Sequence, residues 1–81
     1  MGEEIKIREF IFETFMIGES EEALDNDDSF QDKGVIDSMG ILELIAFVEE
    51  EYGVEVEDEE VISDNFDSVS KLAEYIRRKI A

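Results

Sequence analysis

Ser38 is the residue of this chain whose neighbours give it a possible chemistry. It follows Asp37 where a loop that begins at Gly34 runs into an amphipathic segment. An aspartate before a helix accepts a hydrogen bond from one of the first free amides, so Asp37 is predicted to cap the helix and Ser38 to be its first residue. A phosphate esterified to the Ser38 hydroxyl would then lie at the positive end of the helix dipole, a favourable place for an anion.

The same two residues can also form a helix cap without any chemistry. The chain contains neither histidine nor cysteine, so Ser38 has no obvious internal base and a Ser-His-Asp arrangement is impossible. Nothing in the sequence suggests the burial that separates the pKa values of two carboxyl groups for acid-base catalysis. We therefore expect no catalytic residue, and a reaction at Ser38 needs a base, a metal and a phosphoryl donor from another protein.

The composition restricts the partners. The 81 residues include 24 acidic and 7 basic side chains, for a net charge of −17. This charge repels nucleic acid and anionic membranes and attracts basic proteins, although it could simply keep a small domain soluble. No apolar run is long enough for a membrane span, and the N-terminus has no hydrophobic signal region. We expect one domain over residues 1–81, monomeric and cytoplasmic, with no nucleic-acid partner and no membrane insertion.

Hydrophobic periodicity predicts an all-α fold, a small four-helix bundle with three longer helices, one short helix and a long first loop. Residues 19–34 are too polar for a helix, with Leu24 and Phe30 expected in the core. Residues 52–56 alternate like a strand but have no second run to pair with, so they are expected to be a loop. The helices are predicted over residues 3–16, from 37 or 38 to 53, within 58–65, and from 67 or 68 to the C-terminal end.

One face of each longer helix is expected to point into the core. In the first helix this face is widened at its edges by further apolar side chains. The inward residues are Ile7, Phe10, Ile11 and Phe15, with Ile5, Phe12 and Met16 at the edges; Ile41, Leu44, Ile45, Val48 and Tyr52; and Val69, Leu72, Ala73, Ile76 and Ile80.

The second helix also has an outward face of unusual composition. Its members are spaced by four, three and four residues, and further side chains flank them. An exposed face that mixes methionine, aliphatic side chains and carboxylates is more than a solvated surface needs, so it is predicted to dock a partner beside Ser38. The face consists of Met39, Glu43, Ala46 and Glu50, with Leu42, Phe47 and Glu49 on its flanks.

A metal site is not predicted. Residues 25–29 (Asp-Asn-Asp-Asp-Ser) look like the first half of a calcium-binding loop. The sixth position of such a loop needs glycine and is Phe30 here, and the twelfth needs a bidentate glutamate and is Ile36.

Residues 34–39, in which Asp-Ser and an apolar residue open a helix in a small and very acidic chain, resemble the phosphopantetheine attachment site of the acyl and peptidyl carrier proteins. The resemblance extends over nearly all of the chain. In that family the serine after the aspartate receives the 4'-phosphopantetheine arm of coenzyme A, and Ser38 is the matching position. The resemblance implies an acyl-carrier fold, a covalent 4'-phosphopantetheine at Ser38 and a cargo carried on its thiol as a thioester.

The resemblance also implies the partners. A magnesium-dependent phosphopantetheinyl transferase would modify Ser38, a ligase would load an acyl or aminoacyl group, and downstream acyl-transfer enzymes would dock through basic surfaces. Asp37 matches the aspartate that helps to present the serine and its metal-bound donor, and Met39 matches the apolar residue that partners grip. The acidic positions of the recognition helix are matched by Glu43, Glu49 and Glu50.

The cargo stays open. Fatty-acid carriers usually have an acidic residue where this chain has Gly40, and Asp-Ser-Met-Gly looks more like D-alanyl and other specialised stand-alone carriers. The bulky core weakly favours a small cargo, whereas the heavy acidity resembles fatty-acid carriers. The alternative to a stand-alone carrier is an acidic helical interaction module with no prosthetic group.

Overall fold

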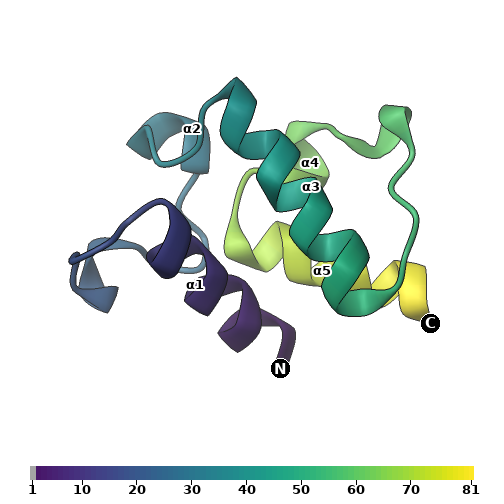
Figure 1. Cartoon of the computed structure of the whole chain (residues 1–81), viewed down its shortest axis with the longest axis horizontal. Coiled ribbons are helices and arrows are strands. Elements are labelled where there is room, and N and C mark those ends of the chain that lie inside the picture. The colour runs from purple at the N-terminus through teal and green to yellow at the C-terminus, as the bar shows by residue number, and fades with distance from the viewer. Residues whose placement is uncertain (1) are drawn as a thin grey trace.

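Three long helices form the frame of the molecule (Figure 1). The computed structural model describes residues 2–81, which contain no β-strand, and the all-α fold expected from the sequence is confirmed. Two further helices are single turns, and two short 3₁₀ turns lie in the connections. In chain order the elements are α1 (Gly2–Thr14), η1 (Glu21–Ala23), α2 (Phe30–Lys33), α3 (Ser38–Tyr52), η2 (Asp58–Glu60), α4 (Ser63–Phe66) and α5 (Val69–Ile80).

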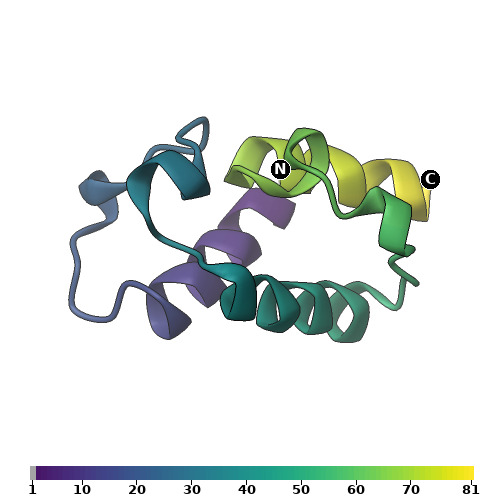
Figure 2. The same ribbon diagram turned by 90° about the horizontal axis from the view of Figure 1, so that it is seen from above.

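Helix α5 is the element on which the others pack, since α1, α3 and α4 all contact it. In Figure 2, α3 and α5 run along opposite sides of the molecule and α1 crosses between them. The fully buried side chains come from all three long helices, as their hydrophobic periods predict: Ile7 and Ile11 of α1, Leu44 and Val48 of α3, and Val69, Leu72, Ala73 and Ile76 of α5.

The expected inward faces are wrong at two positions. Ile5 is 63% exposed, because at 3.6 residues per turn it lies almost opposite Ile7 around α1. Ile80 is 50% exposed, because it is the last residue of α5 and the other elements do not extend far enough to cover it. Tyr75 was not expected in the core but is 2% exposed, with its ring against Phe66.

The long connection between α1 and α3 is held at several points. Leu24 and Phe30 are buried in the core, as predicted. Arg8 of α1 donates hydrogen bonds to the backbone oxygens of Glu21 and Leu24, both at 2.7 Å, and to the Asn26 side chain at 2.9 Å. A single arginine thus fixes the first half of the loop.

The second half of this connection contains a turn of helix that the sequence did not predict. Helix α2 is capped by Ser29, whose hydroxyl oxygen accepts from the Asp32 amide. It is tied to the end of α4, because the Phe30 and Gln31 amides donate to the backbone and side chain of Asp67 at 2.8 and 3.0 Å. These partners are more than 35 residues apart, so no local pattern reveals them.

The two-turn helix expected within residues 58–65 is wrong. The segment forms η2 and α4, separated by Val61 and Ile62, and Ile62 is in an extended conformation (φ −129°, ψ 161°). The Ile62 carbonyl then accepts hydrogen bonds from the Asn65 and Phe66 amides of α4, and the turn carries Phe66 into the core with 3% exposure. Packing of one aromatic ring therefore decides against a continuous helix here.

Candidate functional site

The start of α3 has the predicted geometry. Asp37 is the N-cap in an extended conformation, and its Oδ1 accepts a hydrogen bond from the Gly40 amide at 2.8 Å. Ser38 is the first residue of the helix and its side chain is exposed. The cap satisfies the Gly40 amide, and the first intrahelical hydrogen bond runs from the Ile41 amide to the Asp37 carbonyl at 3.0 Å. The amides of Ser38 and Met39 come before this bond and therefore have no acceptor within the helix.

These features fit a phosphate ester on the serine. The helix is 15 residues long, so its N-terminus carries the partial positive charge of a full dipole. The amides of Ser38 and Met39 are donors close to any phosphate attached to the Ser38 hydroxyl.

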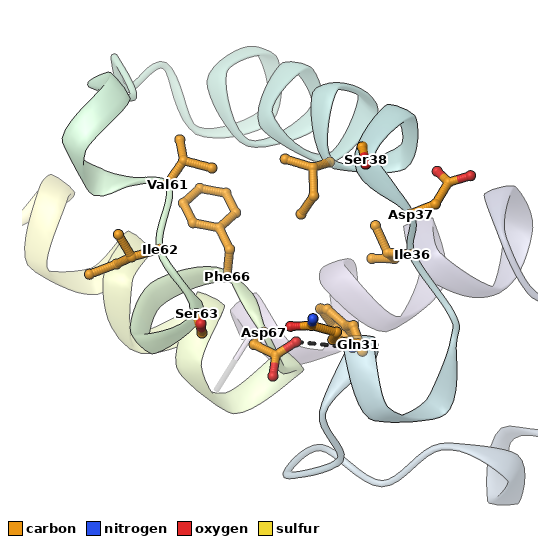
Figure 3. A pocket seen from close by; sticks show the side chains of 11 residues that line it. Gln31, Ile36, Asp37, Ser38, Val61, Ile62, Ser63, Phe66 and Asp67 are labelled. Atoms are coloured by element: carbon orange, nitrogen blue, oxygen red, sulfur yellow. Dashed lines mark hydrogen bonds between the residues drawn. The ribbon is translucent and has the colours of Figure 1, made fainter.

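A groove of about 400 Å³ opens beside Ser38 (Figure 3). Its walls come from α2, α3, α4 and the two residues between η2 and α4, Val61 and the extended Ile62. Ser38 lies at the rim, and the ring of Phe66 points into the space, whereas the side chain of Asp37 points away from it. The lining is apolar at Phe30, Ile36, Ile41, Val61, Ile62 and Phe66, and polar at Gln31, Ser38, Ser63 and Asp67.

The groove is the part of the site that sequence reasoning missed. Apart from the start of α3, its lining comes from segments that the sequence places in a loop or in a continuous short helix. Only their meeting in space makes a cavity beside the serine, and no spacing in the chain signals it.

Most of the expected docking face is exposed together on α3. Met39 is 74% and Leu42 65% exposed, and Glu43, Ala46 and Glu50 are exposed as well. The last three border an open hollow between α1 and α3, lined also by Phe10, Thr14, Phe47 and Glu51.

The flanks of this face serve the fold in part. Glu49 is half-buried, and its Oε2 accepts from the Val56 amide at 2.9 Å, so it anchors the chain that leaves α3. The ring of Phe47 stacks on that of Phe10 with 4.3 Å between centroids. Glu49 therefore presents less of its carboxylate to a partner than Glu43 or Glu50.

Gly40 has a packing role at the site. A Cβ atom there would lie 2.9 Å from Cε1 of Phe15 and 3.0 Å from Cγ2 of Ile36, both tighter than ordinary contact. The absence of a side chain lets the start of α3 approach Phe15 closely. The departure from the acidic residue of fatty-acid carriers thus has a local steric reason.

The carboxylate of Asp28, in the aspartate-rich loop, is engaged within the chain. Asp28 accepts from the Asp25 amide at 2.8 Å and pairs with Lys33 at 3.5 Å, and the backbone hydrogen bond first, then Lys33, lower the pKa of its carboxyl group. Among residues 2–81 no three potential ligand side chains gather closely enough to hold a metal ion. No helix in that range is long and apolar enough to cross a membrane.

Comparisons with known proteins agree with this geometry. Residues 6–76 match the family model described as "Phosphopantetheine attachment site". Acyl carrier proteins of Buchnera aphidicola subsp. Acyrthosiphon pisum, strains Tuc7 and APS, are 37% identical over 76 residues, which cover 94% of this chain and 90% of theirs.

A solved structure described as a crystal structure of an FAD-dependent dehydrogenase contains a chain of similar fold. Its TM-score is 0.77 at 27% identity, over 86% of this chain and 97% of that chain.

The capped serine, the groove beside it and these matches over most of the sequence lead to one conclusion. The chain belongs to the acyl carrier protein family and is a carrier that bears 4'-phosphopantetheine.

Proposed function

We propose that Ser38 is the residue that bears the 4'-phosphopantetheine, and that residues 1–81 act as one stand-alone carrier domain. The observation that carries the proposal is the position of Ser38, exposed at the first position of α3 and at the rim of the groove. The relatives of nearly the same length support the stand-alone form, since the match covers 90% of their sequence.

The chain positions the phosphopantetheine arm and shelters its cargo. The arm supplies a thiol that holds the cargo as a thioester. Asp37 fixes the start of α3 through its Oδ1, and because the residue is exposed, a metal-bound donor on the transferase can approach its carboxylate. The groove receives the part of the arm or cargo that folds back onto the protein, and its apolar lining favours an acyl chain over water.

The partners of this proposal are proteins with basic surfaces. A phosphopantetheinyl transferase modifies Ser38, a ligase loads the arm, and acyl-transfer enzymes receive the cargo. They dock on the exposed side chains of α3, where Glu43 and Glu50 attract basic residues and Met39, Leu42 and Ala46 provide apolar contact. The proposal places this exchange in the cytoplasm and the carrier in the monomeric state.

The cargo is an acyl or aminoacyl group whose length the groove restricts. Because Gly40 has a packing role, it no longer favours an aminoacyl cargo by itself. The groove beside Ser38 limits the chain that the protein can shelter, since a close-packed bundle admits a chain longer than its open space only if its elements part.

The proposal is tested by mass spectrometry. The wild-type protein, incubated with coenzyme A, magnesium and a broad-specificity phosphopantetheinyl transferase, should gain the mass of one phosphopantetheine. Ser38→Ala should gain none. Ser63→Ala is the matched control, because Ser63 is also the first residue of a helix and lines the same groove, yet this variant should be modified like the wild type.

An unmodified wild type would contradict the carrier function and favour the interaction module without a prosthetic group. Modification of Ser38→Ala, or loss of modification in Ser63→Ala alone, would show that the arm is attached elsewhere.

A further inference from the structure

Glu60 is the centre of a polar cluster that joins η2 to α5. Its Oε1 accepts hydrogen bonds from the Tyr75 hydroxyl at 2.9 Å, from Lys79 at 3.0 Å and from the Glu57 amide at 3.0 Å. Lys79 also reaches Oε2 at 3.2 Å. We call Glu60, Tyr75 and Lys79 the clasp, because they connect two segments that are adjacent only in space.

The backbone of Glu60 is held as well as its side chain. The carbonyl of Glu60 accepts from the Asn65 side chain at 2.9 Å, and the Ile62 amide donates to the same carbonyl at 3.0 Å. Residue 60 is thus fixed from α5 through its carboxylate and from α4 through its carbonyl.

The segment that follows the clasp is a wall of the groove. Val61 and Ile62 come directly after Glu60, and both line the space beside Ser38, across from α3 (Figure 3). The wall is bonded to the turns on either side of it, since the Val61 amide donates to the Asp58 carbonyl at 3.2 Å and the Ile62 carbonyl accepts from the Phe66 amide at 2.9 Å. Ile62 itself is extended and 49% exposed. The position of the wall therefore depends on the residues that fix its two ends.

Glu60 and Tyr75 keep their protonation states over the ordinary pH range. The backbone hydrogen bond from Glu57, then the bonds from Lys79 and Tyr75, hold the pKa of Glu60 at about 2. Burial first, then the bond to Glu60, raises the pKa of Tyr75 well above its usual value, so its hydroxyl remains a donor.

We propose that Glu60 is a positioning residue whose clasp with Tyr75 and Lys79 holds the Val61–Ile62 wall in place and so limits the length of acyl chain that the groove shelters. This inference rests on the proposed function in taking the groove as the cargo site. A loosened clasp lets the wall move away from α3, and the enlarged groove then accepts longer chains.

The test uses the absence of cysteine in the chain. Ser38→Cys provides a single thiol at the rim of the groove, to which alkyl chains from propyl to dodecyl are attached as mixed disulfides. Each chain carries a ¹³C-labelled terminal methyl group, and NMR contacts between this methyl and Phe66 or Ile41 report whether it is sheltered. The measured quantity is the longest chain whose methyl group is inside.

The clasp variants Glu60→Gln and Tyr75→Phe, each made in the Ser38→Cys background, should shelter longer chains than the background alone. Hydrogen exchange at the Val61 and Ile62 amides should become several-fold faster in both, with little change in the middle of α3. Lys79→Met should act in the same direction.

Glu4→Gln is the matched control. Glu4 pairs with Arg77 of α5 at a similar exposure, 24% for its side chain against 30% for that of Glu60. Unlike Glu60, which directly precedes Val61, neither Glu4 nor Arg77 is next in the chain to a residue that lines the groove. It should leave the sheltered length unchanged. A length that stays the same in the clasp variants, or that rises equally in Glu4→Gln, would overturn the proposal.

The attached chains need no phosphopantetheine. A Ser38 that a transferase never modifies would therefore contradict the proposed function, while the alkyl series would still decide whether the clasp sets the size of the groove.

Discussion

Asp37 and Ser38 are neighbours with separate roles. The carboxylate of Asp37 is bound to the Gly40 amide, so it shapes the helix start, while the exposed Ser38 hydroxyl is left available to a partner. Both roles were predictable from the sequence, because a cap is a local structure made by residues three apart. The same locality explains why Glu60 was missed, since its clasp partners lie 15 and 19 residues away.

Asp37→Ala should lower the free energy of unfolding by about 1 kcal/mol, because it removes the N-cap of α3. Ser38→Ala should cost less, since alanine is a good first helical residue and the hydroxyl is exposed. Urea denaturation of the two unmodified variants measures the difference. Equal losses would contradict the assignment of the cap to Asp37.

The pKa of Glu60 gives a pH dependence. The carboxyl group titrates at about 2 in the folded chain against an ordinary value of 4.5, so it stabilises the fold fully above pH 4.5, and this stabilisation is lost as the pH falls from there towards 2. Glu60→Gln has no such group. Its deficit in unfolding free energy relative to the wild type should be largest near neutral pH and shrink between pH 4.5 and 2, as measured by urea denaturation at several pH values. A deficit that does not change with pH would contradict the pairing.

Helix α3 combines three tasks along its length. Its start presents Ser38, its inward face packs Leu44 and Val48, and its outward face exposes carboxylates next to apolar side chains. The cap Asp37 and the left-handed Gly53 (φ 66°) define its two ends, so the face that begins at Ser38 has a fixed length.

Glu43→Lys together with Glu50→Lys should slow the modification of Ser38 at low salt, because these charges steer basic partners. The effect should weaken as the Debye length falls from about 10 Å at 0.1 M to about 3 Å at 1 M salt. Rates of phosphopantetheine transfer at the two salt concentrations measure it.

Glu55→Lys together with Glu74→Lys is the control, since both residues are exposed outside the docking face and the change in net charge is the same. Glu3 and Glu4 do not serve as controls, because both pair with Arg77 and their reversal would disturb the contact of α1 with α5. If both double variants slowed the reaction alike, the acidity would act through net charge and not through a face of α3.

For the chain as a whole, the excess of negative charge opposes folding. A net charge of −17 on a chain whose Cα radius of gyration is 11.6 Å creates self-repulsion that the unfolded chain relieves by expanding. Contacts such as Lys6–Glu51, at 2.6 Å, offset only part of it, because basic residues are few. The charge that attracts partners is thus a cost to stability.

Sodium chloride should therefore raise the midpoint of thermal unfolding as its concentration increases from about 0.01 M to about 0.15 M, where the Debye length falls from about 30 Å to about 8 Å. Screening weakens the surface ion pairs too, but the repulsive pairs outnumber them. Calorimetry at constant pH measures the midpoint. A midpoint that falls with salt would show that the ion pairs outweigh the net charge.

What the sequence determined by itself is local or periodic. The inward faces of the long helices, the cap at Asp37, the exposed serine and the glycine stop at Gly53 all follow from residues a few positions apart. There the structure agrees, except at Ile5 and Ile80 of the inward faces. The fold class follows too, because 3.6-residue periods extend through the three long segments that form the frame.

What only the tertiary structure decided depends on contacts between distant segments. Helix α2 forms because Asp67 binds its amides, the segment before α4 opens because Phe66 packs in the core, and the groove exists because these pieces meet beside Ser38. A short element has too few internal hydrogen bonds to determine its own conformation, so tertiary packing selects it. The size of the cargo site is therefore a property of the assembled bundle and cannot be read from any one stretch of the chain.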